Sequence, residues 1–251
     1  MLHEYYNNSN EDGRLRNGKV NKVEYITTLH FLMKHLPIKC SVLDCCAGTG
    51  VYAIPLAEAG YKVTAGDLIQ KHVDIIKAID SKGLLEGVFQ GDVLDMSRFA
   101  DSSFDAVLCL GALYHLQTER EREKAVTECL RVLKKGGIFV FSYINRNACF
   151  INHFKKAPSQ VEQTLRLLDD DSGKVVFYAM DFGEADKLMN KFDTEKIVEV
   201  GTDGLKYVLY EEINTLDDEQ FASYMKYQLA TCAQPSIIGH SMHGLWIGRK
   251  Q

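Results

Sequence analysis

Short apolar runs alternate with amphipathic stretches along most of the chain. The runs are rich in aliphatic and aromatic residues, and most lack a polar side, which is typical of strands buried on both faces of a parallel sheet. They span residues 41–46, 61–65, 104–110 and 137–144. A further short strand is expected just before Gly91.

The stretch between the last two runs predicts a helix with clear boundaries. Thr118 and Glu121 form a capping box at its start. The apolar positions that follow recur at helical spacing, at Val126, Cys129, Leu130 and Leu133. Residues 134–137, two lysines and two glycines, indicate its end. Strands alternating with helices predict a largely parallel sheet with helices on both faces.

Two segments lie outside this alternation. Residues 1–36 begin polar and continue as an amphipathic helix that Pro37 ends. Its expected apolar face consists of Val23, Ile26, Leu29, Met33 and Leu36. In residues 146–181, Ser159 and Glu162 can cap a helix that precedes a polar turn at 169–173. Its apolar residues are Val161, Leu165 and Leu168. We interpret the two segments as an N-terminal helical arm and a small cap.

The rest of the chain returns to the alternating pattern. Residues 182–251 predict a helix from Gly183, a strand over 195–200, a helix capped at Asp217 and a final strand over 244–249. Without a repeat or a flexible linker, residues 1–251 are expected to form one domain. Its parts are the arm (1–36), the core (37–145), the cap insertion (146–181) and the C-terminal part of the sheet (182–251).

Composition narrows the class of protein. The chain has 251 residues, of which 46% are hydrophobic, and a formal charge of −5, whereas a general nucleic-acid binder carries a basic surplus. The N-terminus has no signal-peptide pattern, and no apolar run approaches the roughly 20 residues of a membrane span. The seven cysteines, several in apolar runs, indicate reduced thiols. We expect a soluble cytoplasmic protein that binds neither membrane nor nucleic acid.

A glycine turn carries the most informative chemistry. Residues 42–53 read as a strand, a turn with Gly48 and Gly50, and a helix. Such a turn lets backbone N–H groups approach a ligand at a helix N-terminus. Taken alone, it also fits a dinucleotide-binding fingerprint, or a tight turn that binds nothing.

Three acidic residues follow three successive strands, and together they help to decide between these interpretations of the turn. Asp44 lies at the tip of the first strand, where a carboxylate would repel a pyrophosphate and favour a cation. Asp67 follows the second strand and can accept both hydroxyls of a ribose. Asp92 follows the third and can accept a hydrogen bond from an adenine amine. Each alone could be a solvated loop acid, but the set favours a nucleoside ligand.

The order of these motifs resembles the class I S-adenosylmethionine (SAM)-dependent methyltransferases over residues 38–145. The resemblance implies a Rossmann-like α/β three-layer sandwich whose seven-stranded sheet is parallel except for the last strand. It also implies that SAM is the cofactor. The implied contacts are Asp44 under the methionine ammonium, Ala47, Gly48 and Gly50 at the methionine part, Asp67 with Leu68 at the ribose, Asp92 with Val93 at the adenine, and Leu110 near the methyl group.

The segment after the fourth strand, residues 110–116, borders the methyl group in proteins of this superfamily. It is apolar except for Tyr114 and His115, and it lacks the Asn/Asp-Pro-Pro-Tyr/Phe pattern of enzymes that methylate bases or glutamine amides. It resembles enzymes that act on small molecules. We name Tyr114 and His115 as candidate catalytic residues; His115 is either a general base or a residue that orients the loop.

The N-terminal arm is expected to close over the cofactor, as arms do in similar small-molecule enzymes. Arg14 could meet the methionine carboxylate with two hydrogen bonds, and Tyr6 could cover the site. The alternative is a loose, solvated terminus.

Other clusters carry less chemistry. His240 and His243 lack a third metal ligand nearby, so no metal is expected. Cys45 and Cys46 stand where small residues are commoner, and we interpret them as packing. Two aromatic or apolar helices, at 159–169 and around Phe221, Tyr224 and Tyr227, are expected to cover the acceptor.

The sequence therefore predicts SAM-dependent methyl transfer to a small molecule. The alternatives are a nicotinamide-dependent oxidoreductase, which Asp44 disfavours, and a cofactor-binding protein without catalysis. RNA or protein methylation is disfavoured by the acidic balance. The acceptor and the oligomeric state are not determined by the sequence.

Overall fold

A seven-stranded sheet forms the centre of the computed structural model, which describes residue 6, residues 13–165 and residues 177–251. Its strand order is β3-β2-β1-β4-β5-β7-β6. The strands are β1 (Ser41–Asp44), β2 (Lys62–Asp67), β3 (Gly87–Gln90), β4 (Phe104–Cys109), β5 (Leu133–Ile144), β6 (Thr194–Gly201) and β7 (His243–Lys250).

Only β7 runs against the others. It lies between β5 and β6 and pairs with both in antiparallel register, whereas β1 to β5 pair in parallel. The predicted mostly parallel sheet with an antiparallel last strand is confirmed. Because β7 is antiparallel, its first residue, His243, lies opposite Ile144 at the end of β5. The start of β7 therefore shares an edge of the sheet with the ends of the parallel strands.

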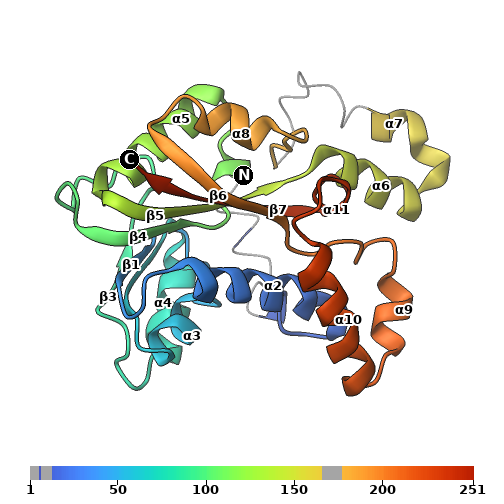
Figure 1. Ribbon diagram of the computed structural model, residues 1–251, viewed down its shortest axis with the longest axis horizontal. Helices are drawn as coiled ribbons and strands as arrows, with labels where there is room; N and C mark the ends of the chain where they lie inside the picture. Colours follow the sequence, from blue (N-terminus) through green and yellow to red (C-terminus); the bar gives the residue numbers. More distant parts are fainter. Residues whose placement is uncertain (1–5, 7–12, 166–176) are drawn as a thin grey trace.

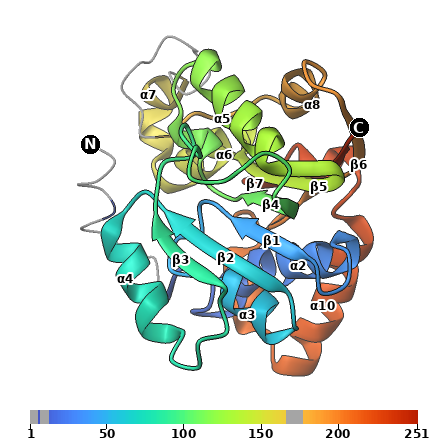
Figure 2. The ribbon, with the colours of Figure 1, turned by 90° about the vertical axis from the view of Figure 1, so that its left-hand side faces the viewer.

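Helices cover both faces of the sheet (Figure 1 and Figure 2). One face carries α5 (Glu119–Val132) and α8 (Glu184–Met189), and the other carries α2 (Lys19–His35), α3 (Ala53–Glu58) and α4 (Gln70–Ile79). The remaining elements are η2 (Leu113–His115), α6 (Arg146–Lys156), η3 (Pro158–Gln160), α7 (Val161–Leu165), α9 (Tyr210–Thr215), α10 (Asp218–Thr231) and α11 (Pro235–Ile238).

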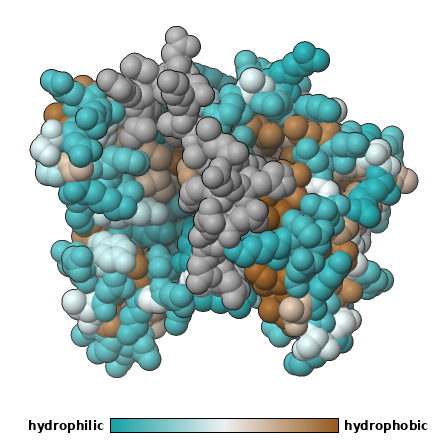
Figure 3. All heavy atoms as spheres, turned by 180° about the vertical axis from the view of Figure 1, so that it is seen from behind, coloured by the Kyte–Doolittle hydropathy of each residue, from teal (hydrophilic) through white to brown (hydrophobic). Residues whose placement is uncertain are grey.

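Alternation along the central strands divides the core in two. On β5, Phe139 and Phe141 pack toward α5 and α8, while Ile138 and Val140 pack toward α2 and α3. All four are at most 1% exposed. Burial of both sheet faces explains why these runs have no polar side. Seen from behind, the periphery is largely hydrophilic, and hydrophobic residues gather right of the centre (Figure 3).

The predicted helix before β5 forms, with one difference at its end. Thr118 and Glu121 make the capping box, with the Glu121 amide donating to the Thr118 hydroxyl at 3.2 Å. The helix ends at Val132, earlier than residues 134–137 suggested. Leu133 already belongs to β5, because it pairs with Phe104 of β4. Leu133, the last residue that fits the helical pattern, is therefore part of the strand β5 and not of the helix.

Helix α2 buries a different set of residues from the predicted stripe. Met33 is 42% exposed, whereas Glu24, Thr27 and Thr28 are buried. The reason is that α2 packs in two directions. Its Leu32 joins the sheet core, and its Val23 joins a separate cluster with α9 and α10. A helix buried on two sides does not show a single apolar stripe.

The cap helix and the aromatic helix differ from expectation. Helix α7 follows η3, no side chain caps η3, and Val161 and Leu165 are 37% and 46% exposed. Leu168 and the turn at 169–173 lie outside the described residues. Phe221 packs with α2 and α9 in the satellite cluster that Tyr224 joins. Among the described residues, neither helix lines the cavity described below, and the prediction that they cover the acceptor stays a prediction.

A search of the described residues for membrane spans finds no helix that combines the necessary length and apolar character.

The capping box of α5 gives a stability prediction. Thr118→Ala should lower the free energy of unfolding by about 1 kcal/mol, because the Glu121 amide loses its acceptor. Urea denaturation measures this change. The control is Thr127→Ala, an exposed position within the same helix, where alanine's higher helix propensity should prevent a loss. Equal destabilisation by both variants would contradict the prediction.

Candidate active site

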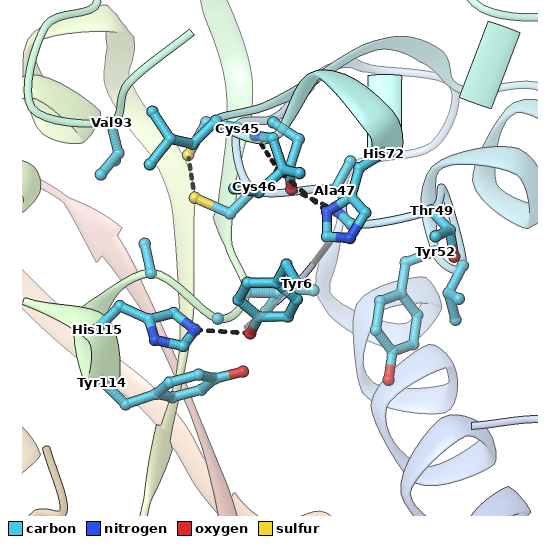
Figure 4. Close-up of a pocket in the computed structure, with 18 of the residues that line it drawn as sticks. Tyr6, Cys45, Cys46, Ala47, Thr49, Tyr52, His72, Val93, Tyr114 and His115 are labelled. Atoms are coloured by element: carbon cyan, nitrogen blue, oxygen red, sulfur yellow. Dashed lines mark hydrogen bonds and ion pairs between the residues drawn. The ribbon is translucent and has the colours of Figure 1, made fainter. Parts of the chain in front are cut away.

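A cavity opens at the carboxyl edge of the parallel strands and contains about 990 Å³ of empty space, its mouth included. Its walls come from the segments that follow β1, β2, β3 and β4, together with Tyr6, Arg14 and Leu15 of the N-terminal arm. Ten of the lining residues are labelled in Figure 4, among them Tyr6, Ala47, Thr49, Val93, Tyr114 and His115. Parallel sheets bind ligands at this edge.

The glycine turn after β1 has a backbone that requires glycine. Gly48 and Gly50 have φ values of 55° and 83°. A Cβ at Gly48 would meet no atom within 4 Å, so the open space above this turn is available to a ligand. Ala47 and Gly48 line the cavity. Gly50 does not, since it lies behind the turn and faces Ile76 of α4.

Asp44 is a buried carboxylate beneath the turn. It is 1% exposed and does not line the cavity itself. Within the described part of the chain, neither oxygen has a hydrogen-bond partner of good geometry. Burial, helped by the charge of Asp67, raises the pKa of Asp44 to about 8 against a smaller opposing effect of the Cys46 amide. A group in this condition is stabilised by an incoming cation.

Asp67 connects the second strand to the glycine turn. Its carboxylate accepts hydrogen bonds from the Gly48 amide at 2.8 Å and the Ile69 amide at 2.9 Å, and His72 Nδ1 lies 3.1 Å away. The residue lines the cavity and is 8% exposed. A carboxylate has about four acceptor sites, so oxygens held in this way can still accept ligand hydroxyls.

The segment after β3 forms the next part of the wall. Asp92 and Val93 both line the cavity, and Leu68 joins them from the end of β2. Asp92 is exposed and accepts from the Leu94 amide at 2.9 Å, whereas Val93 is buried. This wall therefore offers one carboxylate beside an apolar surface.

The helical turn η2 brings two candidate catalytic residues to the opposite wall. Leu110, Tyr114 and His115 line the cavity. The hydroxyl of Tyr6 lies 2.7 Å from Nε2 of His115. Figure 4 shows the Tyr6 ring between His115 and His72, and its edge-on contacts with the two rings have centroid separations of 5.4 Å and 5.3 Å. Tyr6 thus joins two walls of the cavity.

Arg14 also lines the cavity, and its guanidinium lies 3.4 Å from Glu24 of α2. Of the arm residues named from the sequence, Tyr6 and Arg14 are placed at the site, while residues 1–5 and 7–12 are outside the described chain.

A buried ionic cluster beside the site was missed by the sequence reasoning. Glu24, Asp203 and His243 place their ligand atoms within 4.8 Å of one another. The Lys206 ammonium lies 2.8 Å from Glu24 and 3.3 Å from Asp203, so it holds the place that a metal cation would take. Burial opposes the Glu24 charge, but His243, Lys206 and Arg14 together hold its pKa well below the usual value. The only sequence signal was the pair of His240 and His243.

Three thiols gather on the other side of the glycine turn. Cys45, Cys109 and Cys129 are buried with their sulfur atoms within 4.8 Å of one another. All three belong to the hydrophobic core between the sheet and α5. Their surroundings favour packing over reactivity.

Comparison with known proteins relates this architecture to one superfamily. Residues 43–141 match the family described as "Methyltransferase domain". Over 116 residues, the chain is 33% identical to the glycine/sarcosine N-methyltransferase of Aphanothece halophytica, a match that covers 45% of this chain and 44% of that protein. A ubiquinone biosynthesis O-methyltransferase of Rickettsia typhi is 27% identical over 147 residues, with 58% of each chain covered.

Solved structures share the fold over almost the whole chain. A SAM-dependent methyltransferase of Thermotoga maritima, described as a possible histamine N-methyltransferase, has a TM-score of 0.63 at 18% identity and covers 100% of both chains. The magnesium protoporphyrin IX methyltransferase of Synechocystis, with bound SAH (S-adenosylhomocysteine, the demethylated product of SAM), has a TM-score of 0.58 at 14% identity over 100% of this chain and 93% of that one.

The strand order and the acidic strand ends agree with these matches, and residues 43–141 match the methyltransferase domain of class I SAM-dependent enzymes. The matched residues therefore form a methyltransferase domain, and the Synechocystis enzyme of the same fold holds SAH, the product form of the cofactor SAM. The chain spans about half the length of the curated relatives that it matches.

The residues present fit this cofactor. The unpartnered carboxylate of Asp44 suits the methionine ammonium, and the open space above Gly48 allows a ligand close to the backbone. The roles of individual residues remain predictions: Asp67 and Leu68 for the ribose, and Asp92 and Val93 for the adenine.

Asp44 gives a prediction that separates stability from binding. Its pKa is higher in the folded chain, so between the ordinary value of 3.8 and about 8 the folded state binds more protons than the unfolded state. The contribution of Asp44 to stability therefore falls as pH rises through this range, and it is unchanged below it. Asp44→Asn removes the ionisable group, so it should raise Tm at pH 8 but change it little at pH 4.

The same variant should weaken SAH binding, because the buried charge that meets the ammonium is lost. Scanning calorimetry at both pH values and titration calorimetry at pH 8 measure the two effects. Asp193→Asn, an exposed position outside the cavity, is the control and should change neither quantity. A D44N protein that is less stable than wild type at pH 8 would contradict this account of Asp44.

Proposed function

We propose that this protein transfers a methyl group from SAM to a small-molecule acceptor. The observation that carries the proposal is the buried, unpartnered carboxylate of Asp44 beneath a glycine turn at the carboxyl edge of the sheet. Such a carboxylate recognises a ligand that places a cation over the turn, as the methionine part of SAM does.

The rival oxidoreductase function is disfavoured by the same residue. A nicotinamide dinucleotide places its pyrophosphate over this turn, and Asp44 would repel that anion. Asp67 does not discriminate between the two cofactors, because an acid at this position can bind the ribose of either one.

The chain's contribution to the reaction is binding, orientation and exclusion of water. When bound, SAM supplies a methyl carbon that the adjacent sulfonium makes electrophilic. The walls at η2 and the glycine turn hold the two reactants in line, and effective alignment alone can lower a barrier by several kcal/mol. Tyr6, which spans the cavity between His115 and His72, supports the lid role that we infer for the N-terminal arm.

A small acceptor is favoured by the size and lining of the site. Apolar residues dominate the segment 110–116, and the net charge of −5 disfavours nucleic acid. The relatives include N- and O-methyltransferases, so an amine or a hydroxyl is the favoured nucleophile. The free cysteines support a reducing compartment such as the cytoplasm.

Cofactor choice tests the proposal directly. Titration calorimetry should show binding of SAH and none of NAD. Asp67→Ala should weaken SAH binding at least tenfold, because each lost hydrogen bond to a charged group is worth about 1.5–3 kcal/mol before water compensates. Asp95→Ala, an exposed acid near the same edge that does not line the cavity, should bind SAH normally. A preference for NAD would refute the proposed function. Unchanged SAH affinity in Asp67→Ala would show that Asp67 does not bind the ribose.

Methyl transfer and the role of His115 need a second measurement. Transfer of labelled methyl from SAM is followed with amine and phenol acceptors. If His115 is a base, His115→Ala should lower turnover by about 10²–10⁴-fold while SAH affinity stays nearly constant. A mild loss of turnover would assign His115 to orienting the loop. SAH binding without transfer to any acceptor in a broad panel would instead favour a binding protein.

A further inference from the structure

A second cavity adjoins the cofactor site. It contains about 350 Å³ of empty space, its mouth included. Arg14, Leu15, Tyr52, Leu110 and Tyr114 line both cavities, so the two lie on either side of these shared side chains. The far walls are formed by Glu24 and Thr28 of α2, Ser142 of β5, Thr202, and His243 with Leu245 of β7.

His243 is held at this second cavity by a buried carboxylate. Its Nδ1 lies 2.8 Å from Oδ2 of Asp203, which is 0% exposed. The other oxygen of Asp203 accepts from the Ser241 hydroxyl and the His243 amide. Because the carboxylate accepts the proton of Nδ1, Nε2 of the neutral ring carries the lone pair. Within the described residues, Nε2 has no hydrogen-bond partner, although the ring lines the cavity.

We propose that the second cavity binds the methyl acceptor and that Nε2 of His243 takes the proton that the acceptor loses. The proposal rests on the proposed function, and it deepens that function by naming the acceptor site and the class of acceptor. This class is a small molecule whose nucleophilic atom carries a proton, which is an amine nitrogen or a hydroxyl oxygen.

The reaction balances with these groups. The acceptor's N–H or O–H proton passes to Nε2 of His243, and the lone pair of the acceptor atom forms the new bond to the methyl carbon. The carbon–sulfur bond breaks, and its electron pair stays on the sulfur, which becomes a neutral thioether. The histidine then returns its proton to water. Asp203 stabilises the imidazolium in between, as a carboxylate does in other His–Asp pairs.

Charged groups surround His243 on three elements. Glu24 of α2 lies 3.4 Å from Nδ1, Lys206 bridges Glu24 and Asp203, and Arg14 pairs with Glu24. The two carboxylates and the two cations around the imidazole therefore offset one another in charge. Tyr52 and Tyr114 complete the titratable residues at the cavity.

Nε2 of His243 is more available to accept a proton from the acceptor than Nε2 of His115. Nε2 of His115 is already in contact with the Tyr6 hydroxyl at 2.7 Å. The two histidines line the two adjoining cavities, His115 in the cofactor cavity and His243 on the far side of the shared wall.

The kinetic test compares His243→Gln with His240→Gln. His240 is exposed, lies three positions away and lines neither cavity, so its variant should resemble wild type. With sarcosine and catechol as acceptor probes, His243→Gln should lower kcat by about 10²–10⁴-fold and remove the ionisation from the acidic limb of the pH profile. SAH affinity should stay within twofold. If the His243→Gln variant kept the kcat and the pH profile of the wild-type protein, the proposal would be overturned.

Two further measurements test the site, the first of them without turnover. In the SAH complex at pH 8, ¹⁵N NMR should show His243 with a proton on Nδ1 and none on Nε2. Ser142→Leu, which fills the second cavity, should abolish acceptor saturation or raise KM at least tenfold while SAH binds normally. The opposite tautomer, or an unchanged KM, would overturn the proposal. Failure of SAH to bind wild-type protein would refute the proposed function instead, whereas SAH binding with the opposite tautomer would overturn only the role of His243.

Discussion

Parallel strand pairing brings the ends of β1 to β5 to one edge of the sheet, and the site depends on this constraint. Asp44, Asp67 and Asp92 stand at the ends of three neighbouring strands, so residues far apart in the chain meet at one cavity, which Asp67 and Asp92 line and Asp44 lies behind. The antiparallel strand β7 adds a residue that a fully parallel sheet would not supply. Because β7 begins where β5 ends, His243 reaches the same edge from the C-terminal part of the chain.

Two buried carboxylates near this edge differ in whether a neighbouring charge compensates their own. Glu24 is neutralised by Lys206 and Arg14, so its charge is compatible with burial. Asp44 has no such partner within the described chain, and its burial therefore opposes ionisation. A compensated carboxylate holds structure together. A buried carboxylate without a compensating charge favours binding of a cationic ligand. Its burial lowers the stability of the fold, as strained groups at functional sites commonly do.

The N-terminal arm connects the two cavities to each other. Tyr6 bridges the walls of the cofactor cavity, and Arg14 lines both cavities while contacting Glu24. A ligand that moves the Arg14 side chain therefore acts on both sites. This arrangement gives a physical route by which binding of one reactant can prepare the site for the other.

The sequence by itself determined the features that depend on local spacing. Through its resemblance to a known superfamily, the order of motifs over residues 38–145 predicted the sheet. The apolar runs predicted the buried strands, and Thr118 and Glu121 predicted the start of α5. These succeed because each signal lies within a few residues of the feature it specifies. The face of α2 and the His243 cluster were decided only by the tertiary structure. Helix α2 is buried on two sides, so one apolar period cannot describe it. The partners Glu24 and Lys206 are 182 positions apart, and no local pattern records that the folded sheet edge brings them together beside His243.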